Sequence, residues 1–136
     1  TGGMPPEVNL LNEKNNGENV LKLIQDNLVL SSHDVSNGGL IIALSEMTIG
    51  SKYGIKIQKP KKLTNLSQYF FGEDQGRYIL EIDANNLSKS EKILKNNNIY
   101  YENIGFTQKE LFEIEGELQI NVKELFKVNN EWYNKY

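Results

Sequence analysis

Apolar residues recur at intervals of three and four along several stretches of the chain, the spacing of a helix that buries one face. Residues 17–27 show this pattern against a polar background and predict an amphipathic helix. Residues 40–49 are apolar at almost every position, which predicts a central, buried helix. Residues 87–97 predict another helix, capped by Ser88 or Ser90. Two shorter helices are expected at residues 63–71, ending in two buried aromatic side chains, and at residues 122–132.

Short runs between these helices have the alternation and the β-branched composition of strands. The expected strands span residues 28–35, 55–57, 77–82, 99–106, 110–114 and 118–122. Thr107-Gln108 and Gly116-Glu117 are expected to form hairpin turns, so part of the sheet should be antiparallel. The order of elements predicts an α+β fold with a mixed, partly antiparallel sheet packed with helices.

The first sixteen residues contain two glycines, two prolines and four asparagines, which predict an extended lead-in segment over residues 1–16. Residues 17–136 predict a single α+β domain, because a chain of this length can bury one core and no repeat or low-complexity linker interrupts it. The loop-like start at Thr1 predicts a chain that is entered midway, a fragment of a larger multidomain enzyme.

Composition excludes several classes of function. Fifteen basic residues against eighteen acidic ones give a net charge of −3, so the chain lacks the basic footprint of a nucleic-acid-binding protein. Its one dense basic cluster, residues 59–62, is interpreted as a solvated loop. The absence of cysteine excludes disulfides and thiolate chemistry and fits the cytoplasm. No apolar run reaches the roughly 20 residues that span a bilayer, so no membrane partner is expected.

A polar strand end, a glycine pair and an apolar helix follow one another at residues 32–40. Unpaired amides at the start of a helix can bind an anion, and glycine allows its close approach. The same pattern also fits a strand–turn–helix corner, in which the glycines supply backbone freedom and Asp34 stabilises the turn. The first candidate phosphate- or ligand-binding residues are Asp34, Ser36, Asn37, Gly38 and Gly39, with Ser36 or Asn37 as the helix cap.

A second turn, residues 71–78, brings Glu73, Asp74 and Arg77 close together before a strand. Glu73 and Arg77 are candidates for binding Mg²⁺ or a phosphate, and an ion pair of Arg77 with either carboxylate is the alternative. His33 is the only histidine, and adjacent strand residues point to opposite faces, which favours a structural or interface role. No His/Cys cluster, Walker loop or nucleophile elbow is present, so no catalytic or metal-ligating residue is assigned.

Taken in order, these segments resemble the last domain of phosphoribosylformylglycinamidine synthases of the PurL type. The resemblance covers nearly the whole chain and rests on residues 3–10 (GMPPEVNL) with Glu13, 32–40 (SHDVSNGGL), 43–47 (ALSEM), 70–73 (FFGE) and 76–78 (GRY). Asn37 stands where the family more often has Asp, and Gly72 and Asp74 stand where serine is common. The wider superfamily includes aminoimidazole ribonucleotide synthetase, whose C-terminal domain has the fold expected here.

The resemblance implies a ligase of purine synthesis that converts formylglycinamide ribonucleotide to the amidine with ATP and glutamine-derived ammonia. It implies ATP and Mg²⁺ as cofactors of the whole enzyme, neither bound strongly by the isolated domain, which should be inactive alone. The implied partners are the remaining domains, a glutaminase subunit and a small accessory subunit. Two alternatives stay open: another superfamily member, such as a selenophosphate synthetase or hydrogenase maturation factor, and a non-catalytic interaction domain. Pro5-Pro6 favours the synthase over its cousins.

Overall fold

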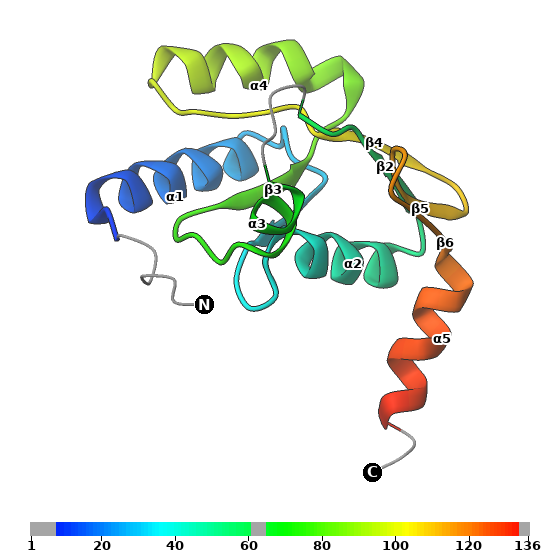
Figure 1. Ribbon diagram of the computed structural model, residues 1–136. Helices are drawn as coiled ribbons and strands as arrows, with labels where there is room; N and C mark the ends of the chain where they lie inside the picture. The colour runs from blue at the N-terminus through cyan, green and yellow to red at the C-terminus, as the bar shows by residue number, and fades with distance from the viewer. Residues whose placement is uncertain (1–7, 61–64, 134–136) are drawn as a thin grey trace. The chain divides into compact units, whose positions relative to one another are not determined.

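The computed structural model describes residues 8–60 and 65–133, which form two compact units (Figure 1). The first unit contains residues 8–43 and 71–102, and the second contains residues 44–60, 65–70 and 103–133. The interpretation of residues 17–136 as one domain stays a prediction.

Helices and strands alternate along the described part of the chain. They are α1 (Leu10–Gln25), β1 (Ser31–Asp34), α2 (Gly39–Ser51), β2 (Gly54–Ile57), α3 (Leu66–Phe71), β3 (Tyr78–Glu81), α4 (Ala84–Asn96), β4 (Gly105–Gln108), β5 (Leu111–Ile114), β6 (Leu118–Asn121) and α5 (Val122–Tyr133). The strands pair in both antiparallel and parallel fashion, so the predicted α+β class is confirmed. None of the helices in residues 8–60 and 65–133 combines the length and apolar character needed to cross a membrane.

The first unit is built around the antiparallel pair β1–β3, in which Asp34 lies opposite Tyr78. Its core contains Leu23 of α1, Leu28 of the following loop and Leu94 of α4, all buried. The side-chain amide of Asn97, at the end of α4, donates to the side-chain oxygen of Asn19 at 2.6 Å. These contacts fix α1 to α4, and Leu80 of β3 packs against the same core, which links the helices to the strand pair.

The second unit contains a four-stranded sheet in the order β4-β2-β5-β6. The hairpin at Gly116-Glu117 joins β5 to β6, as predicted. The predicted turn at Thr107-Gln108 is wrong, because both residues belong to β4 and β2 lies between β4 and β5. The side-chain amide of Gln108 on β4 donates to the carbonyls of Ile55 on β2 and Leu111 on β5, at 3.2 and 2.9 Å. These two hydrogen bonds help to hold β4, β2 and β5 together.

The extended lead-in predicted over residues 1–16 is wrong from Leu10 onward, where α1 begins. Asn9 caps this helix, because its side chain accepts a hydrogen bond from the amide of Asn12 at 3.0 Å. Glu13 adds a negative charge to the first turn, where the helix dipole favours it. Of the asparagines that suggested a loop, Asn9 therefore caps α1, Asn12 and Asn15 are exposed on it and Asn16 is partly buried. Residues 1–7 lie outside the described residues.

Two further predictions of local structure are corrected. Helix α4 begins at Ala84, where the carboxylate of Asp83 accepts from the backbone amide of Asn85 at 2.8 Å, so neither predicted serine is the cap. Ser90 is instead buried inside the helix and donates to a backbone carbonyl one turn earlier. At the end of α3, Phe70 is buried as expected but Phe71 is 58% exposed.

One ion pair crosses the sheet of the second unit. Lys56 on β2 lies directly opposite Glu113 on the parallel strand β5, and their Nζ and Oε1 atoms are 2.9 Å apart. The hydrogen bond from Lys56 lowers the pKa of Glu113 below its usual 4.5. The same bond raises the pKa of Lys56 above its usual 10.5. Both charged forms are therefore favoured in the folded sheet.

We expect the pair to stabilise the second unit between these two pKa values and to stop doing so outside them. The contribution of Glu113 is present above its unfolded pKa and is lost as pH falls through its lower folded pKa; that of Lys56 is lost as pH rises through its higher folded pKa. Urea unfolding at acid and neutral pH should therefore show that the free energy of unfolding falls less on acidification for Glu113→Gln than for the parent chain. Glu110→Gln, an exposed change just before β5, is the matched control. If the free energy of unfolding falls equally on acidification in Glu113→Gln and in the parent chain, this role is contradicted.

Candidate ligand pocket

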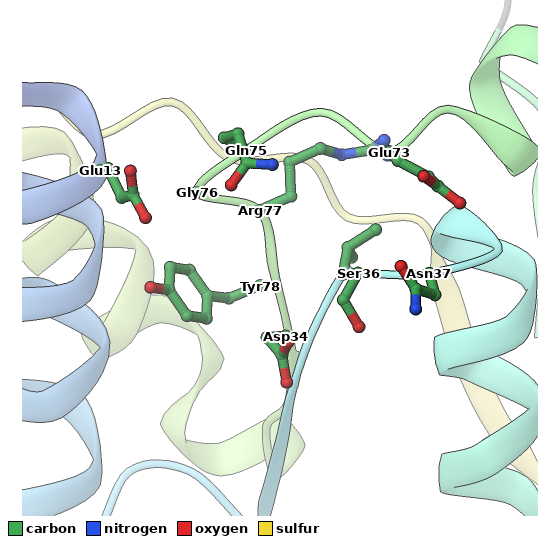
Figure 2. Close-up of a pocket in the computed structure, with 10 residues that line it drawn as sticks. Glu13, Asp34, Ser36, Asn37, Glu73, Gln75, Gly76, Arg77 and Tyr78 are labelled. Carbon is green, nitrogen blue, oxygen red and sulfur yellow. The ribbon is translucent and has the colours of Figure 1, made fainter. Parts of the chain in front are cut away.

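The two segments singled out in the sequence meet in the first unit, where they line a pocket of about 310 Å³ (Figure 2). The pocket lies where β1 ends and β3 begins, with α1 on one side. Of the predicted ligand residues, those that line it are Asp34, Ser36, Asn37, Glu73 and Arg77. The other lining residues are Glu13, Val35, Gln75, Gly76 and Tyr78.

The first wall is the turn between β1 and α2. The amide of Val35 donates to the carbonyl of Arg77 at 2.9 Å, which ends the strand pair, and Gly39 donates to the carbonyl of Ser36 at 3.0 Å. Gly38 and Gly39 have φ of +80° and +71°, a region that side chains disfavour. A Cβ at Gly38 would also lie 2.3 Å from the Cγ1 of Ile42. The glycine pair is therefore required by the backbone and by the start of α2.

The second wall is the loop that precedes β3, and its carboxylate reaches the first wall. The amide of Gly38 donates to Oε1 of Glu73 at 2.8 Å. The amide predicted to meet an external anion therefore holds a carboxylate of the same chain. Arg77 donates to the carbonyl of Gly72 at 3.3 Å and pairs with Asp74 at 3.5 Å, so the predicted surface ion pair is present. Because Asp74 is largely exposed, this pair adds little stability.

Helix α1 forms the third side of the pocket. The side-chain amide of Asn16 donates to the carbonyl of Gly76 at 3.0 Å. A Cβ at Gly76 would lie 3.3 Å from the Cα of Glu13. Glu13 and Tyr78 belonged to segments that carried the family resemblance but were not named as site residues, and Asn16 was not singled out. These contacts join positions about 60 residues apart, and a single sequence carries no signal for them.

The pocket carries more negative than positive charge. Three carboxylates, Glu13, Asp34 and Glu73, and one guanidinium, Arg77, line it. Such a lining offers acceptors for hydroxyl groups and a single cation for a phosphate. His33 is not among the lining residues; its Nδ1 lies 2.6 Å from the backbone carbonyl oxygen of Asp34. Among the described residues, no three His, Cys, Asp or Glu side chains are grouped so as to hold a metal ion.

Comparison with known proteins decides the family. Residues 2–114 match the model of a family described as AIR synthase related protein, C-terminal domain. The chain belongs to this family. The match includes every residue that lines the pocket, whereas α5 lies beyond its end.

Relatives of the chain are subunits named PurL of phosphoribosylformylglycinamidine synthase. The subunit of Pelagibacter ubique is 43% identical over 134 residues, which are 98% of this chain and 18% of that protein. The subunit of Bartonella bacilliformis is 36% identical over 137 residues, with the same coverage. The chain therefore spans less than a fifth of the length of these relatives.

Solved structures agree on the fold of this family. Thermotoga maritima PurL complexed with FGAR matches with a TM-score of 0.72 and 18% identity, over 84% of this chain and 21% of that one. The same protein complexed with ATP matches with a TM-score of 0.71 and 16% identity, over 83% and 21%. At these identities the likeness establishes the fold alone.

Proposed function

We propose that this chain is the C-terminal domain of a PurL-type phosphoribosylformylglycinamidine synthase. The observation that carries the proposal is the alignment of almost the whole chain with PurL subunits, at up to 43% identity among the relatives compared. The proposed enzyme converts formylglycinamide ribonucleotide to formylglycinamidine ribonucleotide, using ATP and glutamine-derived ammonia. The alternatives, a selenophosphate synthetase or hydrogenase maturation factor and a free interaction domain, lack comparable support.

Within this enzyme the pocket of the first unit forms part of the ligand cleft. The solved Thermotoga maritima PurL chains were complexed with FGAR, ATP, AMPPCP and ADP, all of them phosphorylated ligands. Arg77 is the cation in the pocket lining, so it is the group proposed to meet a phosphate. Asp34 and Glu73 are proposed to accept hydrogen bonds from hydroxyl groups, and Ser36 and Asn37 to complete the contacts.

The glycine pair has a supporting part in the proposal. Gly38 and Gly39 shape the turn, and the amide of Gly38 already donates to Glu73. A phosphate on this amide would have to displace the Glu73 carboxylate, because one N–H cannot serve both anions. The amide therefore positions the Glu73 loop, and it meets a ligand only when that loop moves.

Magnesium fits the whole enzyme better than this chain. ATP is the proposed phosphoryl donor, and a cation such as Mg²⁺ would neutralise its phosphates. The described residues contain no group of three ligands that suits a metal ion. We therefore assign the metal and most of the nucleotide contacts to other domains of the synthase.

The proposed partners are those other domains and two further subunits. One solved chain that matches this fold comes from an assembly named PurLQS of Thermotoga maritima. By analogy, a glutaminase that supplies ammonia and a small accessory subunit would join this enzyme. A cysteine-free chain suits the reducing cytoplasm in which we place it.

A hybrid enzyme tests the proposed function. In the Pelagibacter ubique PurL subunit, the aligned residues are replaced by this chain, which is 43% identical to them. We expect the hybrid to form amidine from formylglycinamide ribonucleotide, ATP and ammonia. A hybrid that folds and binds ATP but forms no amidine would contradict the proposal.

The chain alone should form no amidine in the same assay. Phosphoryl transfer requires several cations and metal ligands to converge on one point, and the pocket contributes one guanidinium. The assay is run at equal molar concentrations of hybrid and chain, with the hybrid as the positive control. Amidine formed by the chain alone, above the level without protein, would show that the active site is complete within these residues.

A further inference from the structure

The chain contains two asparagines that are followed by glycine, Asn16 before Gly17 and Asn37 before Gly38. In this arrangement the backbone nitrogen of the glycine can approach the side-chain carbonyl carbon of the asparagine, because glycine has no side chain in the way. Ring closure between these atoms is the usual route by which asparagine loses its amide. The two pairs provide the same chemistry in two different settings.

The settings differ in backbone and in side-chain restraint. Asn16 lies inside α1, and its side-chain amide donates to the carbonyl of Gly76 at 3.0 Å. Asn37 is exposed in the turn before α2, and its side chain makes no hydrogen bond within residues 8–60 and 65–133. The helix holds the backbone of Asn16 in one conformation, whereas the Asn37 side chain is free to rotate towards Gly38. Reaction at Asn16 therefore requires local opening of α1, and reaction at Asn37 does not.

We infer that Asn37 is a site of spontaneous deamidation and that Glu73 slows the reaction. The backbone nitrogen of Gly38 bonds to the Cγ of Asn37, its proton passes through water to the Nδ2 group, and the Cγ–Nδ2 bond breaks to release ammonia. Water then opens the five-membered imide at either carbonyl, which gives aspartate or isoaspartate at position 37. The net change consumes one water and releases one ammonia, with no oxidation or reduction.

Glu73 opposes the first step through its hydrogen bond. The Gly38 amide donates to Oε1 of Glu73 at 2.8 Å, so this bond must break before the nitrogen can turn to Asn37. The negative carboxylate also disfavours the negative charge that develops on the nitrogen as its proton leaves. The turn therefore combines a reactive pair with a contact that holds the pair apart.

The product would change the pocket, whatever its ligand. An aspartate at position 37 adds a fourth carboxylate to a lining that holds Glu13, Asp34 and Glu73. Isoaspartate also lengthens the main chain between positions 37 and 38, which moves the Gly38 amide away from Glu73. Aspartate is the residue that the family more often has at this position, so isoaspartate is the product expected to disturb the turn.

Peptide mapping of this chain tests the inference, because trypsin separates the two pairs. Cleavage after Lys14, Lys22 and Lys52 places Asn16 in residues 15–22 and Asn37 in residues 23–52. After incubation at mildly alkaline pH, mass spectrometry should show the conversion of amide to acid mainly at Asn37. Loss of the Glu73 contact in Glu73→Ala should speed conversion at Asn37 roughly threefold to tenfold. Glu91→Ala, an acidic change on α4 outside the pocket lining, should leave the rate unchanged.

The Asn16 peptide reports whether the fold is intact in each sample. In urea both pairs should convert at similar rates, since the sequence around the reacting atoms is then the only influence. Equal rates of deamidation at Asn16 and Asn37 in the folded protein would contradict the assignment of Asn37 as the reactive site. A rate at Asn37 that does not rise in Glu73→Ala, while Asn16 stays slow, would overturn the role of Glu73. If the deamidation rate at Asn16 also rises in Glu73→Ala, the fold of that variant is disturbed, and Glu73→Gln is used in place of Glu73→Ala for the same comparison.

Discussion

Gly54→Ala is expected to destabilise the second unit by about 3 kcal/mol, the upper range for forcing an atom into a packed site. Gly54 begins β2, and a Cβ there would lie 2.1 Å from the carbonyl oxygen of Leu111 on β5. The obstacle is backbone rather than the end of a flexible side chain, so the parallel pair β2–β5 must separate to admit the methyl group. Urea unfolding, followed through the strand signal in circular dichroism, measures the loss.

Gly50→Ala is the matched control for this prediction. Gly50 lies in α2, and a Cβ there would meet no atom within 4 Å. The same methyl group should therefore be neutral or should stabilise the helix by up to about 1 kcal/mol. Equal unfolding curves for the two variants would show that β2 and β5 are not in close contact. The difference between them isolates the steric effect from the general effect of replacing glycine.

Arg77→Gln in the Pelagibacter hybrid is expected to raise the KM for formylglycinamide ribonucleotide about tenfold, the range for losing a hydrogen bond to a charged group. Arg77 is the cation proposed to hold the phosphate, and its guanidinium is kept in place by the carbonyl of Gly72 and by Asp74. Glutamine keeps a polar amide in the pocket lining while the charge is lost. Because the phosphate is bound equally in the ground and transition states, kcat should change less than KM.

Lys89→Gln provides the control for charge. Lys89 is exposed on α4 and does not line the pocket, so the substitution removes a positive charge without touching the proposed site. Its KM should equal that of the parent hybrid. If Arg77→Gln and Lys89→Gln behave alike, the pocket does not bind the substrate phosphate, and the assignment of Arg77 is wrong.

Local pattern was enough to locate most elements and the β5–β6 hairpin, but not the order of the strands in the sheet. The apolar run at residues 40–49 and the strand at 77–82 are recovered as α2 and β3, because burial of these segments follows from their own composition. The order of the second sheet depends instead on the close approach of backbones at Gly54 and Gly105, to segments distant in sequence. The only sign of such a contact in the sequence is a glycine, and a single sequence does not show whether a glycine lies at a close backbone contact or in a turn.

The candidate site was predictable in its parts and not in its assembly. Each turn combined glycine with polar side chains, which singled out Ser36 and Asn37 in one and Glu73 and Arg77 in the other. The hydrogen bond from Gly38 to Glu73 crosses 35 residues and was not foreseen. It matters because it turns a presumed anion site into a site that already holds a carboxylate.

Hydrogen–deuterium exchange of the hybrid, with and without formylglycinamide ribonucleotide, tests most directly whether the pocket binds the substrate of the proposed synthase. Ligand should slow exchange in peptides that cover residues 35–40 and 72–78, the two turns that line the pocket. Residues 84–96 of α4 lie outside the lining and should exchange at an unchanged rate. Saturable binding of the ribonucleotide that leaves both turns unprotected would contradict the assignment of this pocket to the ligand cleft.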